Sequence, residues 1–195
     1  MNTMIANAVD ALKSGGIVIF PTDTVYGIGM LATDKNNPDE LFQIKQRPPQ
    51  KKIPLLVADK TSLDTYACSV PKYAYLLSTK YWPGALTLVL KAGTAVPLQF
   101  VADDGSIALR MPNNAIALSL IAASSAPLAT SSANISGEAA VTDISDLSPN
   151  LLKRVDAIVD VGRLPLATPS TIVSCLGSKA KVLRRGEVDI NIDID

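Results

Sequence analysis

The sequence contains no histidine among its 195 residues. This absence excludes a histidine general base, a Ser-His-Asp or Cys-His catalytic group, and a zinc site with histidine ligands. Any catalysis by this chain must therefore use other groups.

Cysteine is almost absent too. Cys68 and Cys175 lie far apart and form no CxxC pair, so we expect neither a disulfide framework nor a metal site, only two buried thiols. This favours a reducing cytoplasm, and the N-terminal segment agrees because it lacks a basic region followed by a continuous apolar core. The longest stretch without charge, 111–137, is interrupted by Pro112 and Pro127, so we expect no membrane span.

Excess charge and aromatic residues are also lacking. The 18 Lys and Arg balance the 18 Asp and Glu, and only 5% of residues are aromatic. A net charge of zero argues against holding nucleic acid by bulk electrostatics alone. The basic residues are nevertheless concentrated in two segments, 45–60 and 179–185.

Helical and strand patterns alternate along the chain. Helices are predicted over 4–14, from Asn37-Pro38 through Ile44, over 71–81, over 114–123 and from Ser148-Pro149; strands are predicted over 17–20, 54–58, 85–92, 106–111, 127–133, 157–161, 170–175 and 181–185. This alternation predicts an α/β fold with a mixed, twisted sheet. We expect one domain over residues 1–188 and an acidic tail over 189–195.

Polar residues gather where the predicted strands and helices end. PTDTVYGIG (21–29) follows the first strand, and it matches neither the Rossmann nor the P-loop glycine pattern. SSANISG (131–137) has the hydroxyls, amide and glycine of a loop that binds phosphate through neutral donors. Each of these motifs is weak alone.

Taken in order, seven motifs resemble the YrdC/TsaC family of L-threonylcarbamoyladenylate synthases. They are PTDTVYG (21–27), KQRP (45–48), WPGALT (82–87), ALRMP (108–112), SSANISG (131–137), STIV (170–173) and LRRG (183–186). The resemblance covers roughly residues 5–188. It implies a YrdC-like fold, in which a twisted, open, mixed sheet flanked by helices encloses a concave and positively charged cavity.

The resemblance also implies a reaction. L-Threonine, bicarbonate and ATP would give threonylcarbamoyl-AMP and pyrophosphate, and the product would serve the t6A modification of tRNAs that decode ANN codons. The nucleophile is a carbamate formed on the substrate amine, so the site needs positioning and charge neutralisation more than an acid-base residue. The lack of histidine is consistent with this chemistry.

The site residues implied by the resemblance fall into three overlapping sets. The threonine-binding set is Thr24, Arg110, Ser132 and Ser170. The ATP-binding set is Lys45, Arg47, Lys51, Ser106, Asn134, Thr142 and Arg184. The catalytic set is Lys45, Arg47, Ser132 and Asn134. No metal site of the protein is expected, because no carboxylate cage is visible and Mg2+ would arrive with the nucleotide. The implied partners are the t6A transferase machinery and, with direct contact left open, tRNA.

Two alternatives stay open. One is a paralogue of the same fold that uses a different carbamoyl-adenylate substrate. The other is a non-catalytic module that binds double-stranded RNA or tRNA through the two basic segments. The residues PQKKI (49–53) lengthen the segment after KQRP relative to the commoner family form, so it is also open whether Lys51 or Lys52 contacts phosphate.

Overall fold

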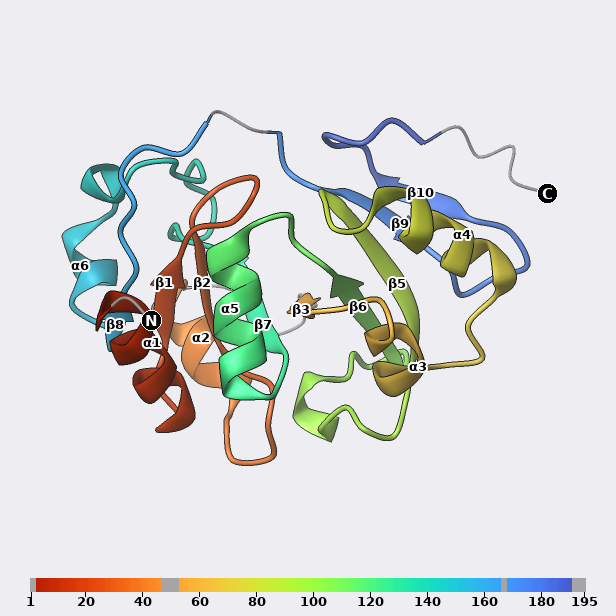
Figure 1. Cartoon of the computed structure of the whole chain (residues 1–195), viewed down its shortest axis with the longest axis horizontal. Helices are drawn as coiled ribbons and strands as arrows, with labels where there is room; N and C mark the ends of the chain where they lie inside the picture. The colour runs from red at the N-terminus through yellow and green to blue at the C-terminus, as the bar shows by residue number, and fades with distance from the viewer. Residues whose placement is uncertain (1–2, 47–52, 166–167, 191–195) are drawn as a thin grey trace.

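One mixed β-sheet runs through the molecule. The computed structural model describes residues 3–46, 53–165 and 168–190 (Figure 1). Within them the strands are β1 (Val18–Phe20), β2 (Gly27–Leu31), β3 (Leu55–Leu56), β4 (Ala67–Cys68), β5 (Leu86–Ala92), β6 (Ser106–Arg110), β7 (Leu128–Ser132), β8 (Ala157–Ile158), β9 (Thr171–Ser174) and β10 (Lys181–Arg184). Their order across the sheet is β10-β9-β5-β6-β3-β7-β2-β1-β8, and β4 pairs with β5.

The two-residue strand β3 joins the two sides of this sheet. It runs parallel to β6, where Leu56 is opposite Arg110, and antiparallel to β7, where Leu56 is opposite Leu128. Strands β5, β6, β9 and β10 lie on one side of β3, and β7, β2, β1 and β8 lie on the other (Figure 1).

Helices cover both faces of the sheet. They are α1 (Thr3–Lys13), α2 (Pro38–Ile44), α3 (Ser62–Tyr66), α4 (Lys72–Tyr81), α5 (Ala115–Ser124) and α6 (Pro149–Leu152). The helices α1 and α5 pack against each other on one face of the sheet (Figure 1) and enclose the smaller core with Val18 and Phe20. The intervening Ile19 joins the larger core, which also takes in side chains of α2, α3 and α4. Successive strand residues therefore enter opposite cores, as the period of two requires.

The structure confirms the predicted fold class and most of the predicted elements. The proline-led start of α2 is as expected, because the Asn37 side chain accepts a hydrogen bond from the Asp39 N–H. The main error is β2: no strand was predicted between 21 and 53, and the structure has a central strand that begins at Gly27. A side chain at Gly29 would come within 2.6 Å of the Ala129 carbonyl oxygen on β7, so glycine here serves strand packing.

Two further observations concern the C-terminal segment and the length of the helices. Ile190, within the segment expected to be an acidic tail, is buried in the larger core. None of the helices in the described ranges is long and apolar enough to cross a membrane.

Candidate active site

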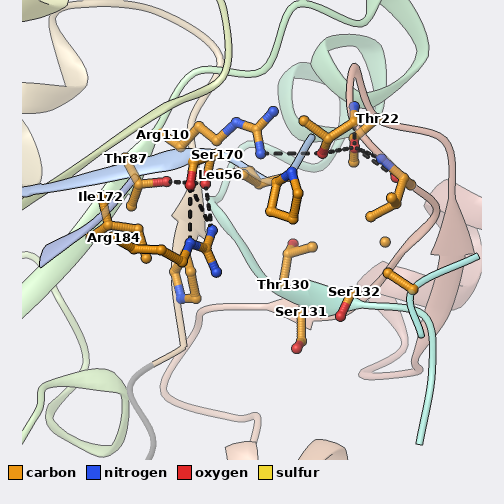
Figure 2. Close-up of a pocket in the computed structure, with 16 residues that line it drawn as sticks. Thr22, Leu56, Thr87, Arg110, Thr130, Ser131, Ser132, Ser170, Ile172 and Arg184 are labelled. Carbon is orange, nitrogen blue, oxygen red and sulfur yellow. Dashed lines mark hydrogen bonds between the residues drawn. The ribbon is translucent and has the colours of Figure 1, made fainter. Parts of the chain in front are cut away.

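A cavity of about 310 Å3 lies on the sheet, and its lining comes from both sides of β3 and from none of the described helices (Figure 2). From the side of β5, β6 and β9 come Thr87, Arg110 and Ile172; from the other side come Thr130 and Ser132. Strands that are distant in the sequence thus meet around one space.

These residues face the cavity because successive side chains of a strand project from opposite faces of the sheet. Leu86, Leu88, Leu109 and Val173 enter the larger core, so their strand neighbours Thr87, Arg110 and Ile172 project from the opposite face. The register places Thr87 directly opposite Ile172 and Leu56 directly opposite Arg110. The sheet itself therefore forms the floor of the cavity.

Arg110 is held at the end of β6 by three groups. Its Nε donates to the Gly84 carbonyl oxygen at 3.1 Å, its Nη2 donates to Asp23 Oδ1 at 2.6 Å, and its Nη1 lies 3.5 Å from Thr24 Oγ1. The residue is buried, with 7% of its surface exposed. These contacts fix the plane of the guanidinium group on the cavity wall.

The loop between β1 and β2 is fixed at both ends. At its start, the Thr22 hydroxyl donates to the Val25 carbonyl and accepts from the Thr24 N–H at 3.1 Å. At its end, the buried Tyr26 hydroxyl donates to the Gly162 carbonyl at 2.7 Å. Burial is the main reason why the pKa of Tyr26 is raised, so its phenol remains a donor. Thr24 is thereby placed against Arg110.

Ser170, Thr87 and Arg184 form a second polar group on the cavity wall (Figure 2). The Ser170 hydroxyl lies 3.0 Å from the Thr87 hydroxyl, and Arg184 Nη2 donates to Ser170 Oγ at 3.1 Å. Arg184 also donates to the Ser170 carbonyl oxygen from Nη2 at 2.7 Å and from Nε at 3.1 Å. Desolvation, with the positive charge of Arg110 nearby, lowers the pKa of Arg184. An anion bound beside both guanidinium groups would relieve that repulsion.

Lys45 supports the loop that follows β7. Its side chain is buried, and Nζ donates to the carbonyl oxygens of Ser132 and Asn134, the latter at 2.6 Å. The Ser132 hydroxyl in turn donates to Asn134 Oδ1 at 2.5 Å. Three members of the predicted catalytic set are therefore in direct contact, and Lys45 lies behind the loop and not among the residues that line the cavity.

A second pocket of about 350 Å3 adjoins the first. It is lined by Asn134 and Thr142 from the predicted ATP-binding set, and Ala140 lines both pockets. The structure thus places these two residues next to the cavity that holds the four members of the predicted threonine-binding set, Thr24, Arg110, Ser132 and Ser170.

Ser106 is not brought to either pocket. It lies at the far end of β6 from Arg110, is fully buried, and donates its hydroxyl proton to Asp104 Oδ1 at 2.6 Å. Arg47 and Lys51 lie outside the described residues. Their assignment stays a prediction.

Two hydrogen-bond partners of the predicted site residues were not predicted. Asp23 pairs with Arg110, and Thr87 pairs with Ser170. Asp23 belongs to the recognised motif PTDTVYG and Thr87 to the recognised motif WPGALT. Neither motif indicates which residue elsewhere in the chain its side chain contacts. Among the described residues there is no group of three or more Cys, Asp or Glu that could hold a metal ion.

Comparison with known proteins identifies the family of this chain. The family model for Sua5, YciO and YrdC proteins, described as "Telomere recombination", matches residues 10–186. A threonylcarbamoyl-AMP synthase of Pyrococcus abyssi is 34% identical over 92% of this chain and 53% of its own length. A threonylcarbamoyl-AMP synthase of Bacillus subtilis is 34% identical over 94% of this chain and 54% of its own length. The chain spans about half the length of these two relatives.

A relative of similar length also matches. Escherichia coli YciO, whose name states no activity, is 30% identical over 96% of this chain and 91% of its own length, and its crystal structure has a TM-score of 0.87 at 29% identity, covering 97% and 92% of the two chains. The crystal structure of P. abyssi Sua5 complexed with L-threonine has a TM-score of 0.88 at 34% identity and covers 93% and 54% of the two chains. The family match and the shared fold agree, and the chain belongs to the Sua5/YciO/YrdC family.

Proposed function

We propose that this chain is a threonylcarbamoyl-AMP synthase, which forms L-threonylcarbamoyl-AMP and pyrophosphate from L-threonine, bicarbonate and ATP. The observation that carries the proposal is the cavity wall, where Arg110 lies with the hydroxyl-bearing residues Thr24, Ser132 and Ser170. A guanidinium group can bind both oxygens of a carboxylate, and hydroxyls can bind the side chain and amine of a hydroxy-amino acid.

The proposed chemistry needs no acid-base side chain of the histidine type. The amine of threonine and bicarbonate give a carbamate and water. A carbamate oxygen then forms a bond to the α-phosphorus of ATP, and the bond to the β-phosphate oxygen breaks to release pyrophosphate. The protein contributes orientation and cations that neutralise the phosphates.

The nucleotide is proposed to lie across the two adjoining pockets. Asn134 and Thr142 line one, and Arg184 lines the other. Arg47 and Lys51 are the proposed further phosphate ligands. Mg2+ enters as the MgATP substrate, because the described residues include no carboxylate cluster for a resident ion. The product would pass to the transferase machinery that places t6A on tRNA.

The relatives support this proposal in different degrees. The two synthases share the family and about a third of the aligned residues, but they are longer than this chain. YciO matches along nearly its whole length. The assay must therefore separate threonylcarbamoyl-AMP formation from another adenylation by the same fold.

Pyrophosphate release provides that assay. Purified protein with MgATP and bicarbonate should release pyrophosphate only when L-threonine is added, and mass spectrometry should detect threonylcarbamoyl-AMP. Release that is equal with L-threonine, glycine or no amino acid would refute the proposal, and release that depends on another carbamoyl donor would favour the paralogue.

A matched pair of arginine variants locates the activity. Arg110→Gln should abolish L-threonine-dependent release, because it removes the carboxylate partner in the cavity. Arg185→Gln removes an arginine whose side chain is 82% exposed, and it should retain the activity. Equal loss in both variants would place the reaction elsewhere.

A further inference from the structure

Thr87 carries a buried hydroxyl that has no role in the proposed reaction. Only 1% of its surface is exposed, and it lines the cavity from the middle of the sheet on β5. Among the described residues, Ser170 Oγ at 3.0 Å is the only hydrogen-bond partner of its hydroxyl. The position of the Thr87 hydroxyl is therefore tied to that of Ser170.

The hydrogen bond between Thr87 and Ser170 can run in either direction, and the other donor at Ser170 is Arg184. An arginine can only donate, so Arg184 Nη2 occupies one acceptor position of Ser170 Oγ. If Thr87 donates to Ser170, it occupies the second acceptor position. The single Ser170 proton then has no acceptor among the described residues and must point away from both donors, toward the cavity.

The surroundings of this proton favour an anion. Arg110 and Arg184 line the same cavity as the Ser170 hydroxyl, and Arg184 donates to it. The three groups are all donors, whereas an amide at this place would bring an N–H donor of its own. A carboxylate has only acceptors and matches all three.

We propose that Thr87 is a positioning residue of the amino-acid subsite. Its hydroxyl holds Ser170 as a committed donor, so that the subsite selects a carboxylate over a neutral amide. This inference rests on the proposed function, since it takes L-threonine as the ligand. Without the Thr87 proton, Ser170 Oγ could rotate and accept a hydrogen bond from an amide.

The test compares the binding of L-threonine and L-threoninamide by calorimetry. Thr87→Val keeps the side-chain volume and removes the hydroxyl, and it should weaken L-threonine binding about tenfold, because Ser170 is then no longer held as a donor to the carboxylate. The preference for L-threonine over the amide should fall in the same variant. Thr87→Ser restores the hydroxyl and should restore both values.

A double-mutant cycle tests whether Thr87 acts through Ser170. In a Ser170→Ala background, Thr87→Val should cause no further loss of preference for the carboxylate. Ser78→Ala is the matched control: it removes a buried hydroxyl on α4, outside the cavity, whose proton is given to the Tyr75 carbonyl at 2.9 Å, so the preference should not change.

The outcomes separate the two proposals. If the unaltered protein does not bind L-threonine, the proposed function fails. If it binds L-threonine but Thr87→Val keeps the full preference, or if Thr87→Ser loses as much as Thr87→Val, the role of Thr87 is packing and the inference is overturned. Thr87→Ala provides the same comparison if valine disturbs the fold of β5.

Discussion

Arg110 and Asp23 form an ion pair with an N–O distance of 2.6 Å, and only 9% and 13% of the two side chains are exposed. Asp23 comes from the loop between β1 and β2, whereas Arg110 ends β6 on the other side of β3. The pair thus joins two walls of the cavity and sets the orientation of the proposed carboxylate ligand.

Replacing Asp23 by asparagine should raise the KM for L-threonine. Asn keeps an acceptor oxygen but loses the charge that holds Arg110, so we expect about a tenfold rise, from the loss of a charge-assisted hydrogen bond. The KM for MgATP should change by less than about twofold, because the ion pair does not bind nucleotide. Pyrophosphate release at varied substrate concentrations measures both. Asp34→Asn, at an exposed aspartate, is the control; an unchanged KM for L-threonine in Asp23→Asn would contradict the positioning role.

Replacing Lys45 by methionine should lower both stability and turnover. The buried Nζ satisfies the Ser132 and Asn134 carbonyl oxygens, so its loss should reduce the free energy of unfolding by about 1–3 kcal/mol. The loop that carries both side chains would then lose its support. Urea denaturation and pyrophosphate release give the two readouts, and Lys35→Met, at an exposed lysine, should change neither. Full stability with lost turnover would instead indicate that Lys45 acts on phosphate alone.

Replacing Gly186 by alanine should disturb the Ser170 corner of the cavity. An added Cβ would lie 2.1 Å from the Pro169 carbonyl oxygen, so the backbone must move, at a cost of about 1–3 kcal/mol. L-Threonine binding should weaken with it, because Ser170 follows Pro169 directly. At Gly177 the nearest atom to an added Cβ is 3.8 Å away, and Gly177→Ala should be tolerated. Calorimetry and thermal denaturation of both variants decide whether the close approach is as tight as the structure indicates.

Cys175 should make the protein less stable at alkaline pH. Burial raises the pKa of this thiol from 9.0 to about 12. Above pH 9 the unfolded chain releases the proton while the folded chain retains it, so stability falls as pH rises, by up to about 1.4 kcal/mol per pH unit. Urea midpoints from about pH 8 to about pH 10 measure this fall. Other groups also titrate in this pH range, so the test compares the fall in stability with pH between the unaltered protein and Cys175→Ala. The fall should be less steep in Cys175→Ala. Equal slopes would contradict the shifted pKa.

Local patterns in the sequence predicted much of the fold and little of the site's internal contacts. The start of α2 at Asn37-Pro38 and the buried strand β1 follow from capping chemistry and apolar runs. The strand β2 was missed because two of its five residues are glycines, whose role depends on the close approach of β7. The close packing of β2 against β7 joins segments far apart in the chain, so it cannot be predicted from the local sequence.

The same distinction applies to the cavity. Thr24, Arg110, Ser132 and Ser170 could be named because they stand in motifs that resemble a known family, and the structure brings them to one cavity. The partnerships of Asp23 with Arg110 and of Thr87 with Ser170 join residues far apart in the chain. They depend on strand order and register, which local propensity does not determine.

The order of the strands has a consequence for synthesis of the chain. Strands β1 and β2 build one side of the sheet, β5 and β6 then build the other, β7 and β8 return to the first, and β9 and β10 come last. Among the described residues that line the cavity, the last to leave the ribosome are therefore Pro169, Ser170, Ile172 and Arg184. A nascent chain that ends before β9 lacks Ser170 and Arg184, so the wall of the cavity that these two residues form is the last to be completed.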